Sequence, residues 1–333
     1  MQPSISIITP SYNQGRYLEE NIVSVFNQGI VGLEHIIIDG GSTDNSKEIL
    51  EKHDGKLTYW VSEWDRGQSD AVNKGFTKAT GEIIGWLNSD DYYPPGALQV
   101  ILNAFSDPSV NVVCGASILF DEKGKQQKGV STIGPNRGLE FHLRFPDINQ
   151  PATFFRRKVM AEFMPLNTAL HYIMDRELWT KYVQQYGIDF TKILDDTIVY
   201  FRIHSESKSG TKEAEFDNEY ATLLYCFAKQ NKLEEIARLL GLHYKLVAGY
   251  SYSNAKYPAE ETTLNMLRYF ILKRGSLVFN KSQFNFAKKA YSLLDIKNYN
   301  ILLTEEKALK RITAIANTLN WTHFRLKRKF NLV

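Results

Sequence analysis

The first 100 residues alternate between short apolar runs and amphipathic segments, and this alternation limits the possible folds more than any other feature. The apolar runs have the length of buried strands, and they are Ile5–Thr9, His35–Ile38, Leu57–Val61 and Glu82–Leu87. The segment after the first run places Leu18, Ile22 and Val25 at helical spacing, with Ser11 or Asn13 as the expected N-cap. Repeated strand–helix units predict an α/β fold with a mostly parallel sheet covered by helices on both faces.

Acidic residues stand where two of these strands end. Asp39 closes the second strand, and the adjacent carboxylates Asp90 and Asp91 follow the fourth. Neighbouring carboxylates repel each other, and a divalent cation with open positions for phosphate oxygens offsets that repulsion. The pair is equally typical of a plain turn. Because ligands bind beyond the carboxyl ends of parallel strands, we expect both acidic positions at one ligand-binding edge.

Four motifs in order resemble the family 2 glycosyltransferases, over roughly the first 210 residues. They are Ile8–Asn13, Ile38–Asp44, Asp65–Gly67 and Asn88–Asp91. The resemblance implies a GT-A fold, which is Rossmann-like, and inverting, metal-dependent transfer of a sugar from a nucleotide diphosphate sugar. The implied enzyme is of the hexosyltransferase type and uses Mn2+ or Mg2+. Its acceptor would be a hydroxyl of a glycan or of a lipid-linked acceptor, as in cell-surface polysaccharide biosynthesis.

The resemblance assigns the nucleotide to the first motifs. Asp39 matches the acidic residue that accepts a hydrogen bond from the base, which suits the ring N–H of UDP or dTDP. Thr9, Pro10 and Tyr12 match the positions beside the base, where an aromatic ring can stack. Arg66 is placed to reach the diphosphate. The alternatives are a helix-capping role for Asp39 and a solvated turn arginine at position 66.

The resemblance gives the carboxylate pair two roles. Asp91 matches the metal ligand and Asp90 the residue near the ribose hydroxyls. Asn88 stands where the family often has Asp, which removes one negative charge but still allows a hydrogen bond to ribose or to a metal-bound water. His204 lies in a segment that approaches the metal or the diphosphate in the family, and imidazole can ligate Mn2+ or donate to a phosphate oxygen.

The general base implied by the resemblance is Asp175, which precedes a Leu-Trp helix segment. Inverting transfer needs such a group, because the acceptor hydroxyl must lose its proton as it attacks. Glu177 competes for this role, and a helix-capping function for Asp175 is the plainer interpretation.

Charge divides the chain into two parts. Residues 1–210 carry 20 Lys and Arg against 26 Asp and Glu, whereas residues 211–333 carry 20 against 11, so their formal charges are −6 and +9. We therefore expect a GT-A domain over residues 1–210 and a C-terminal α-helical extension over residues 211–333. Two cysteines, Cys114 and Cys226, are too few for a disulfide framework, which favours a cytoplasmic location.

The last segment mixes aromatic and basic side chains. Trp321 and Phe324 stand beside Arg325 and Lys327–Lys329, a mixture that suits the interface of an anionic membrane. This pattern predicts a peripheral association with the inner face of the membrane, and a solvated basic tail is the alternative. We expect no nucleic acid partner, because no recognition motif is present and the first part of the chain is acidic.

Two other functions fit parts of the pattern. A sugar nucleotidyltransferase shares the layout, but it would need a Gly-rich basic loop where this chain has Pro10–Asn13. A non-catalytic nucleotide-sugar-binding protein would be favoured if Asp175 proved dispensable.

Overall fold

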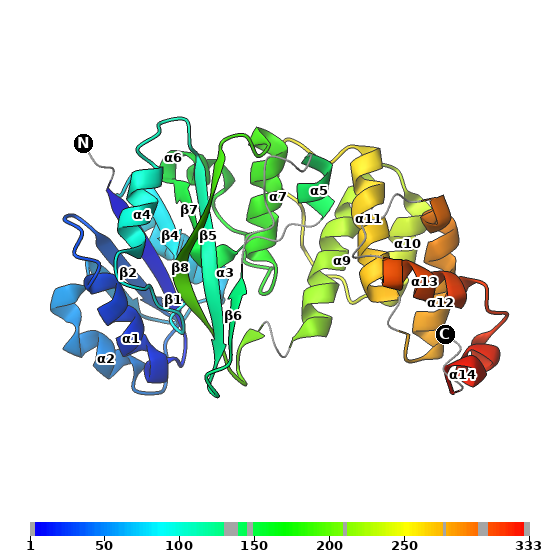
Figure 1. Ribbon diagram of the computed structural model, residues 1–333, viewed down its shortest axis with the longest axis horizontal. Coiled ribbons are helices and arrows are strands. Elements are labelled where there is room, and N and C mark those ends of the chain that lie inside the picture. Colours follow the sequence, from blue (N-terminus) through cyan, green and yellow to red (C-terminus); the bar gives the residue numbers. More distant parts are fainter. Residues whose placement is uncertain are drawn as a thin grey trace. The chain divides into compact units, whose positions relative to one another are not determined.

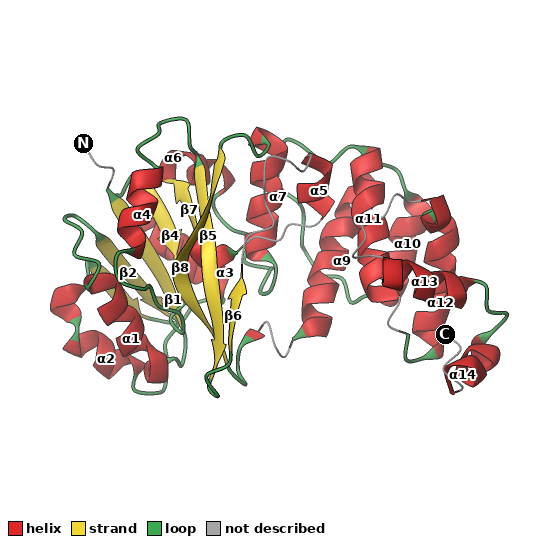
Figure 2. Ribbon diagram, in the orientation of Figure 1, coloured by secondary structure: helices red, strands yellow, loops and turns green. Residues whose placement is uncertain are grey.

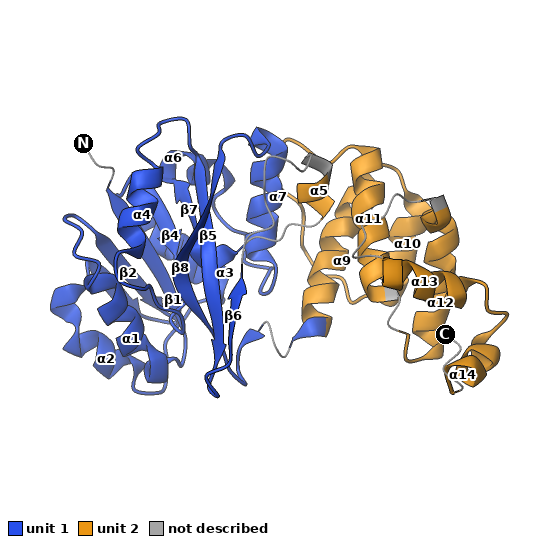
Figure 3. Ribbon diagram, viewed as in Figure 1, with its two compact units in different colours: residues 1–137, 146–213 blue, residues 138–145, 214–333 orange. Residues whose placement is uncertain are grey.

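The computed structural model describes residues 4–129, 139–144, 149–208, 212–275, 278–298 and 306–329. The chain divides into two compact units, which Figure 3 shows in different colours. The first comprises residues 1–137 and 146–213, and the second comprises residues 138–145 and 214–333. The second unit thus includes a short segment, 138–145, that the predicted division at residue 210 leaves in the first.

The first unit is built on one mixed sheet, drawn in yellow in Figure 2. Its strands are β1 (Ile5–Ser11), β2 (Glu34–Asp39), β3 (Tyr59–Ser62), β4 (Ile83–Trp86), β5 (Val112–Asp121), β6 (Gln126–Gly129), β7 (Thr153–Arg156) and β8 (Thr191–Ile203). Their order is β3-β2-β1-β4-β7-β5-β6, with β8 paired to β5. The first four strands are parallel, β7 runs antiparallel to β4 and β5, and β8 is parallel to β5. This arrangement confirms the predicted α/β fold.

Helices cover both faces of this sheet (Figure 1). They are α1 (Gly15–Phe26), α2 (Ser46–Lys52), α3 (Gln68–Lys78), α4 (Ala97–Ala104), α6 (Arg157–Met160) and α7 (Met174–Tyr186). Side chains alternate along β1, so Ile5 and Ile7 pack with Leu98 of α4. The next side chain, Ile8, points the other way and contacts α3, where a Cβ on Gly75 would lie 2.4 Å from Ile8 Cγ2.

The predicted N-cap of α1 is wrong. Ser11 is the last residue of β1, and the helix begins after Gln14, which makes no side-chain cap bond. Instead, the Gly15 N–H donates to a carboxylate oxygen of Asp44 at 2.9 Å. The Asn13 side chain accepts the N–H of Thr43 at 2.8 Å. The loop after β2 therefore caps α1 and holds the loop after β1.

The second unit is helical in its described residues. Its helices are α5 (Leu139–Arg144), α9 (Glu213–Gln230), α10 (Glu234–His243), α11 (Glu260–Gly275), α12 (Lys281–Leu293), α13 (Glu306–Ala316) and α14 (Trp321–Lys329). This confirms the expected helical extension, and α5 adds to it by lying against α11. Within the described ranges we find no helix with the length and apolar character that a membrane crossing requires.

The aromatic residues of α14 lie in the core of this unit. The ring of Phe324 is 5.4 Å from Phe284 and 5.6 Å from Trp321, measured between ring centroids, and Phe324 is 5% exposed. The expectation that Phe324 anchors the protein in a membrane interface is therefore wrong, whereas Trp321 is only partly buried and its role there stays a prediction. The helix buries its aromatic face against α12 because that face completes a hydrophobic cluster.

Candidate active site

The carboxyl ends of β1, β2 and β3 meet at one edge of the sheet. Ser11 lies beside Asp39 in the β1–β2 pair, and Asp39 lies beside Ser62 in the β2–β3 pair. The Gly40 N–H donates to the Ser11 carbonyl at 2.8 Å, which continues the pairing past the strand ends. The Leu87 N–H does the same with Ile8 at 3.0 Å, so the segment leading to Asn88 leaves the sheet at this edge.

Asp39 organises the turn after β2. Its Oδ2 accepts the Ser42 N–H at 2.9 Å and the Ser62 hydroxyl at 2.7 Å, and its Oδ1 accepts the Ser42 hydroxyl. The side chain is fully buried in this arrangement. Oδ1 takes one of these three bonds, so it keeps a lone pair for a further donor.

Tyr12 lies next to this turn and is 61% exposed, so its ring is free to stack on a ligand. The neighbouring Asn13 N–H donates to the Ser42 hydroxyl at 2.7 Å. Pro10 is buried within β1. Thr9 is fully buried, with its hydroxyl 3.1 Å from His35 Nε2, so the structure does not support a direct contact between Thr9 and a ligand.

The loop after β3 brings a further carboxylate to the turn. Asp65 lies over Gly40, where a Cβ would be 2.8 Å from its Oδ2, so a larger residue there would displace the Asp65 carboxylate. Burial raises the pKa of Asp65, with Asp70 and Asp39 adding repulsion. Arg66 is bound to Asp70 at 2.9 Å and its side chain is 60% exposed. To reach a diphosphate, Arg66 would have to leave Asp70.

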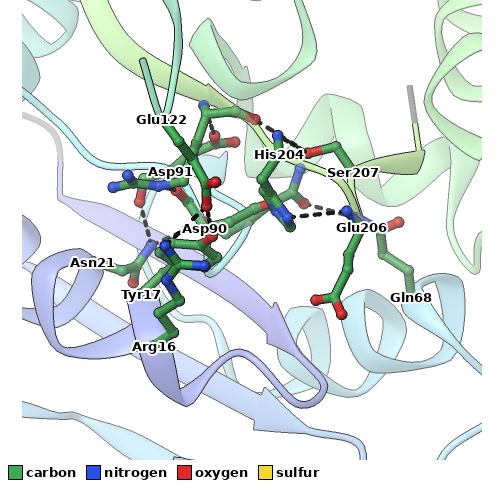
Figure 4. A network of polar contacts seen from close by, with 12 residues as sticks. Arg16, Tyr17, Asn21, Gln68, Asp90, Asp91, Glu122, His204, Glu206 and Ser207 are labelled. Atoms are coloured by element: carbon green, nitrogen blue, oxygen red, sulfur yellow. Dashed lines mark hydrogen bonds and ion pairs between the residues drawn. The ribbon is translucent and has the colours of Figure 1, made fainter. Parts of the chain in front are cut away.

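Asp90 and Asp91 have different surroundings (Figure 4). The Asp90 side chain is 20% exposed, and its Oδ2 lies 3.1 Å from His204 Nε2. The Asp91 side chain is buried and its Oδ1 accepts the Arg202 N–H at 2.9 Å, whereas its Oδ2 has no hydrogen-bond partner among the described residues. Burial, followed by repulsion from Asp90, raises the pKa of Asp91 well above its usual range. Asp90 is therefore the more accessible of the two carboxylates, whereas Asp91 keeps one oxygen that is buried and unpaired among the described residues.

The tautomer of His204 follows from its two contacts. The Glu206 N–H donates to Nδ1 at 3.3 Å, so Nε2 carries the proton and donates it to Asp90. In this state His204 is a hydrogen-bond donor. Its ring lies 5.0 Å from the Tyr17 ring, which fixes its orientation.

Arg202 holds the carboxylate pair in place through contacts with its backbone and neighbours. The sequence did not indicate this role. Its Nε donates to the Asp90 carbonyl at 3.1 Å, and its guanidinium bonds Glu20. The guanidinium carbon lies 4.5 Å from the Tyr17 ring centroid and 4.6 Å from that of Phe120. These aromatic neighbours on α1 and β5 come from distant parts of the sequence, so spacing alone could not reveal them.

Asn88 sits in a network of side-chain amides. Its Oδ1 accepts Gln68 Nε2 at 2.7 Å and the indole N–H of Trp86 at 3.0 Å. Gln150 Nε2 donates to the Trp86 carbonyl at 2.7 Å, and Lys208 Nζ donates to Gln68 Oε1 at 3.0 Å. Gln68 and Lys208 were missed in the sequence, because neither belongs to a motif. The network joins the acidic turn to the next pocket.

Asp175 lines that pocket at the start of α7. The other lining residues are mostly apolar, and they are Ile84, Trp86, Gln150, Thr153, Phe155, Met160 and Leu178. Burial raises the pKa of Asp175, and the Arg176 N–H, which donates to its Oδ1 at 2.8 Å, opposes this rise. The rival candidate Glu177 is fully buried and ion-paired with Lys181 at 3.3 Å, so it cannot reach an acceptor in this conformation.

The residues at this edge fit a divalent cation with few protein ligands. The described residues hold no cluster of three or more His, Cys, Asp or Glu side chains arranged for a metal. Asp90 offers a carboxylate oxygen, and the imidazole of His204 becomes a ligand only if it gives up its Nε2–H bond to Asp90. A cation here would take most of its ligands from phosphate oxygens and water.

A mixed sheet with a carboxylate pair at its carboxyl edge, and a buried carboxylate in the adjoining pocket, defines a GT-A type of transferase fold. Residues 6–164 match the family model described as Glycosyl transferase family 2. Over this segment, which is just under half of the chain, the protein is similar to family 2 of the glycosyltransferases.

Two proteins similar in sequence to this chain are named as glycosyltransferases. An uncharacterized glycosyltransferase of Nostoc sp. is 29% identical over an alignment of 230 positions, which covers 63% of this chain and 70% of the relative. One of Rickettsia conorii is 26% identical over an alignment of 342 positions, which covers 93% of this chain but 54% of the relative. The chain thus spans about half the length of that protein.

The fold is also that of a solved glycosyltransferase. The crystal structure of S. aureus TarS 1–349 in complex with UDP-GlcNAc has a TM-score of 0.57 and 16% sequence identity, and the match covers 95% of this chain and 91% of that one. At 16% sequence identity, this similarity shows the fold alone.

Proposed function

We propose that this chain transfers a sugar from a nucleotide diphosphate sugar to an acceptor hydroxyl, with inversion at the anomeric carbon. The proposal rests on one observation. A single hydrogen-bond network around Asn88 connects the acidic turn with the pocket that Asp175 lines. The partly exposed carboxylate Asp90 follows the segment Trp86–Asn88, and the half-buried carboxylate Asp175 lines a pocket with Trp86, which Gln150 binds through its side chain. Donor binding and base catalysis need groups of these two kinds next to each other.

The donor would bind along the strand ends. Asp39 Oδ1 retains a lone pair for a base N–H, which favours UDP or dTDP, and Tyr12 offers a ring for stacking. We assign the metal to Asp90 with His204, in place of the predicted Asp91, because Asp91 is buried and held by Arg202. When bound, a Mn2+ or Mg2+ ion would neutralise charge on the departing diphosphate.

Asp175 would accept the proton of the acceptor hydroxyl. Its burial and raised pKa make it a stronger base than a solvated carboxylate. The apolar wall of the pocket would exclude water from the reacting hydroxyl. We propose a glycan or a lipid-linked glycan as the acceptor, because the family acts on hydroxyl groups of this class.

The contacts around α1 disfavour a sugar nucleotidyltransferase. Such an enzyme needs free N–H donors and cations for phosphates in the loop after the first strand. Here the Gly15 N–H already binds the Asp44 carboxylate, and the loop carries Tyr12 and Asn13 instead of glycines.

The test begins with a panel of uridine, thymidine and guanosine diphosphate sugars, measured by thermal stabilisation with Mn2+ or with chelator. A donor that binds raises Tm in a metal-dependent manner, by an amount set by its concentration relative to Kd. That donor is then incubated with candidate acceptors, and the anomeric configuration of the product is read by NMR. A retained configuration, or stabilisation by no nucleotide sugar, would refute the proposal.

A further inference from the structure

The positive charge of the second unit is concentrated at its end. Residues 278–333 carry 11 Lys and Arg against 3 Asp and Glu, a formal charge of +8, whereas residues 211–277 carry 9 against 8. The described part of this stretch contains α12, α13 and α14. Nearly all of the excess charge therefore lies on three neighbouring helices.

The helix α14 separates its side chains by face. Trp321 and Phe324 pack inward against Phe284, as described above. The opposite face carries Thr322, Arg325, Leu326 and Lys329, at helical spacing and all exposed. Leu326 is 53% exposed, with Arg325 beside it and Lys329 one turn away.

A second exposed apolar residue lies next to this helix. Phe279, which precedes α12, is 64% exposed, and the guanidinium carbon of Arg328 lies 5.3 Å from the centroid of its ring. Arg328 Nη1 also donates to the Val278 carbonyl at 2.8 Å, which holds α14 against the start of α12. Phe279 therefore lies beside α14 at the edge occupied by Arg328, and Arg325 and Lys329 continue from that edge toward Leu326.

The cations of this patch are not neutralised by acidic neighbours. Within the ranges that the structure describes, Arg325, Arg328 and Lys329 form no ion pair. We define the α14 surface as Phe279, Arg325, Leu326, Arg328 and Lys329.

We propose that the α14 surface docks the protein on a lipid bilayer that contains anionic headgroups. Phosphate headgroups attract the three cations, and Phe279 and Leu326 leave water by entering the boundary between headgroups and acyl chains. A soluble polyanion would satisfy the cations but would leave both apolar side chains in water. The combination of charge with exposed apolar groups therefore selects a membrane over a nucleic acid or an acidic protein. This proposal concerns binding and does not depend on the proposed transferase activity.

The test is co-sedimentation of the full chain with vesicles of phosphatidylglycerol and phosphatidylcholine, compared with pure phosphatidylcholine, at low and high salt. We expect binding to the anionic vesicles at low salt and release as salt screens the attraction. Arg325→Glu with Lys329→Glu should weaken the binding by at least about tenfold, since each cation near an anionic surface contributes appreciably. Leu326→Ser should weaken it by about threefold or more without altering the charge.

The matched control is Arg238→Glu with Lys245→Glu, which makes the same change of charge at exposed positions in and just after α10. This variant should bind within about twofold of the wild type. Equal losses in both double variants would overturn the proposal, because binding would then reflect net charge alone. Absence of binding by the wild type at low salt would also overturn it. The proposal would also be overturned if the Leu326→Ser variant bound vesicles as the wild type does and polyphosphate displaced the protein fully from them. The surface would then bind soluble polyanions.

Discussion

Replacing Asp175 with asparagine separates the catalytic role of this carboxylate from its effect on stability. Asparagine has nearly the same shape, and its Oδ1 can still accept the Arg176 N–H. It cannot take a proton from an acceptor hydroxyl. We expect transfer to fall by a factor of about 100 or more, which corresponds to about 2.7 kcal/mol of transition-state stabilisation. Donor binding should be unchanged, because the asparagine lies in the pocket and not at the nucleotide.

The same substitution should stabilise the fold at neutral pH. Burial raises the pKa of Asp175 above its usual value of 3.8, so the folded state binds the proton more tightly than the unfolded chain does. The stabilising contribution of the protonated form is complete below pH 3.8 and is lost as pH rises through the folded pKa. At pH 7 the wild type therefore buries an ionised group that the Asp175→Asn variant lacks. Each kcal/mol of relief would raise Tm by about 2–4 °C in a domain of this size.

Asp107→Asn is a control that should change Tm in the opposite direction at neutral pH. The Asp107 carboxylate is exposed and accepts the Ser109 hydroxyl and N–H, and these bonds lower its pKa. Its stabilising effect is present above the usual pKa and is lost as pH falls through the folded pKa. Asp107→Asn should therefore lower Tm slightly at pH 7, and its difference from the wild type should vanish in acid. Transfer activity should not change.

The assays are a transfer rate at saturating donor and thermal melts from pH 7 down to below the usual aspartate pKa of 3.8. The wild-type rate should fall on the acid side as Asp175 takes up its proton. An Asp175→Asn variant that transfers sugar at the wild-type rate would refute the assignment of the base. A variant that melts below the wild type at every pH would refute the electrostatic argument, because burial of the charge would then not be the dominant effect.

Other substitutions test the acidic turn. Asp90→Asn should weaken Mn2+-dependent binding of a nucleoside diphosphate by about tenfold or more. Asp91→Asn keeps an acceptor for the Arg202 N–H, so it should bind the nucleotide within about threefold of the wild type. Calorimetry with and without chelator measures both affinities. Equal losses of nucleotide binding in the two variants would support Asp91 as a metal ligand. Arg202→Ala should lower the free energy of unfolding by about 2 kcal/mol or more, because its guanidinium packs on two rings and bonds the Asp90 carbonyl. Urea denaturation that showed no change would contradict this.

The positions of the first four strands and the edge at which their carboxyl ends meet were predictable because they depend on runs of apolar residues. Each run is long enough to specify a buried strand, and parallel strands place their carboxyl ends together. The direction of a single side chain was not predictable in the same way. Thr9 and Pro10 are adjacent at the end of β1, and a shift of one residue sends a side chain to the other face of a sheet.

The same limit explains the assignment within the acidic pair. Asp90 and Asp91 are chemically identical and adjacent, so the motif cannot tell which one faces inward. The difference comes from β8, whose parallel pairing with β5 delivers the Arg202 N–H to Asp91 and His204 to Asp90. These contacts span more than 110 residues of sequence. Local pattern carries no information about contacts at that separation.

The contacts of the pair also change the argument for a metal. Two adjacent carboxylates suggested a cation because of their mutual repulsion, yet each already has a donor from the protein. Asp91 accepts the Arg202 N–H, and Asp90 accepts the Nε2–H of His204. The Asn21 side-chain amide adds bonds to the Asp91 and Asn88 carbonyls, both at 2.9 Å, which hold the turn itself. These bonds hold the turn without a cation, although Asp91 Oδ2 is buried and has no hydrogen-bond partner among the described residues. We therefore expect a metal to act mainly on the bound ligand. Removal of divalent ions by chelator should leave the Tm of the unliganded protein unchanged while it abolishes stabilisation by a nucleotide sugar. A lower Tm of the unliganded protein in chelator would show instead that a cation separates the two carboxylates.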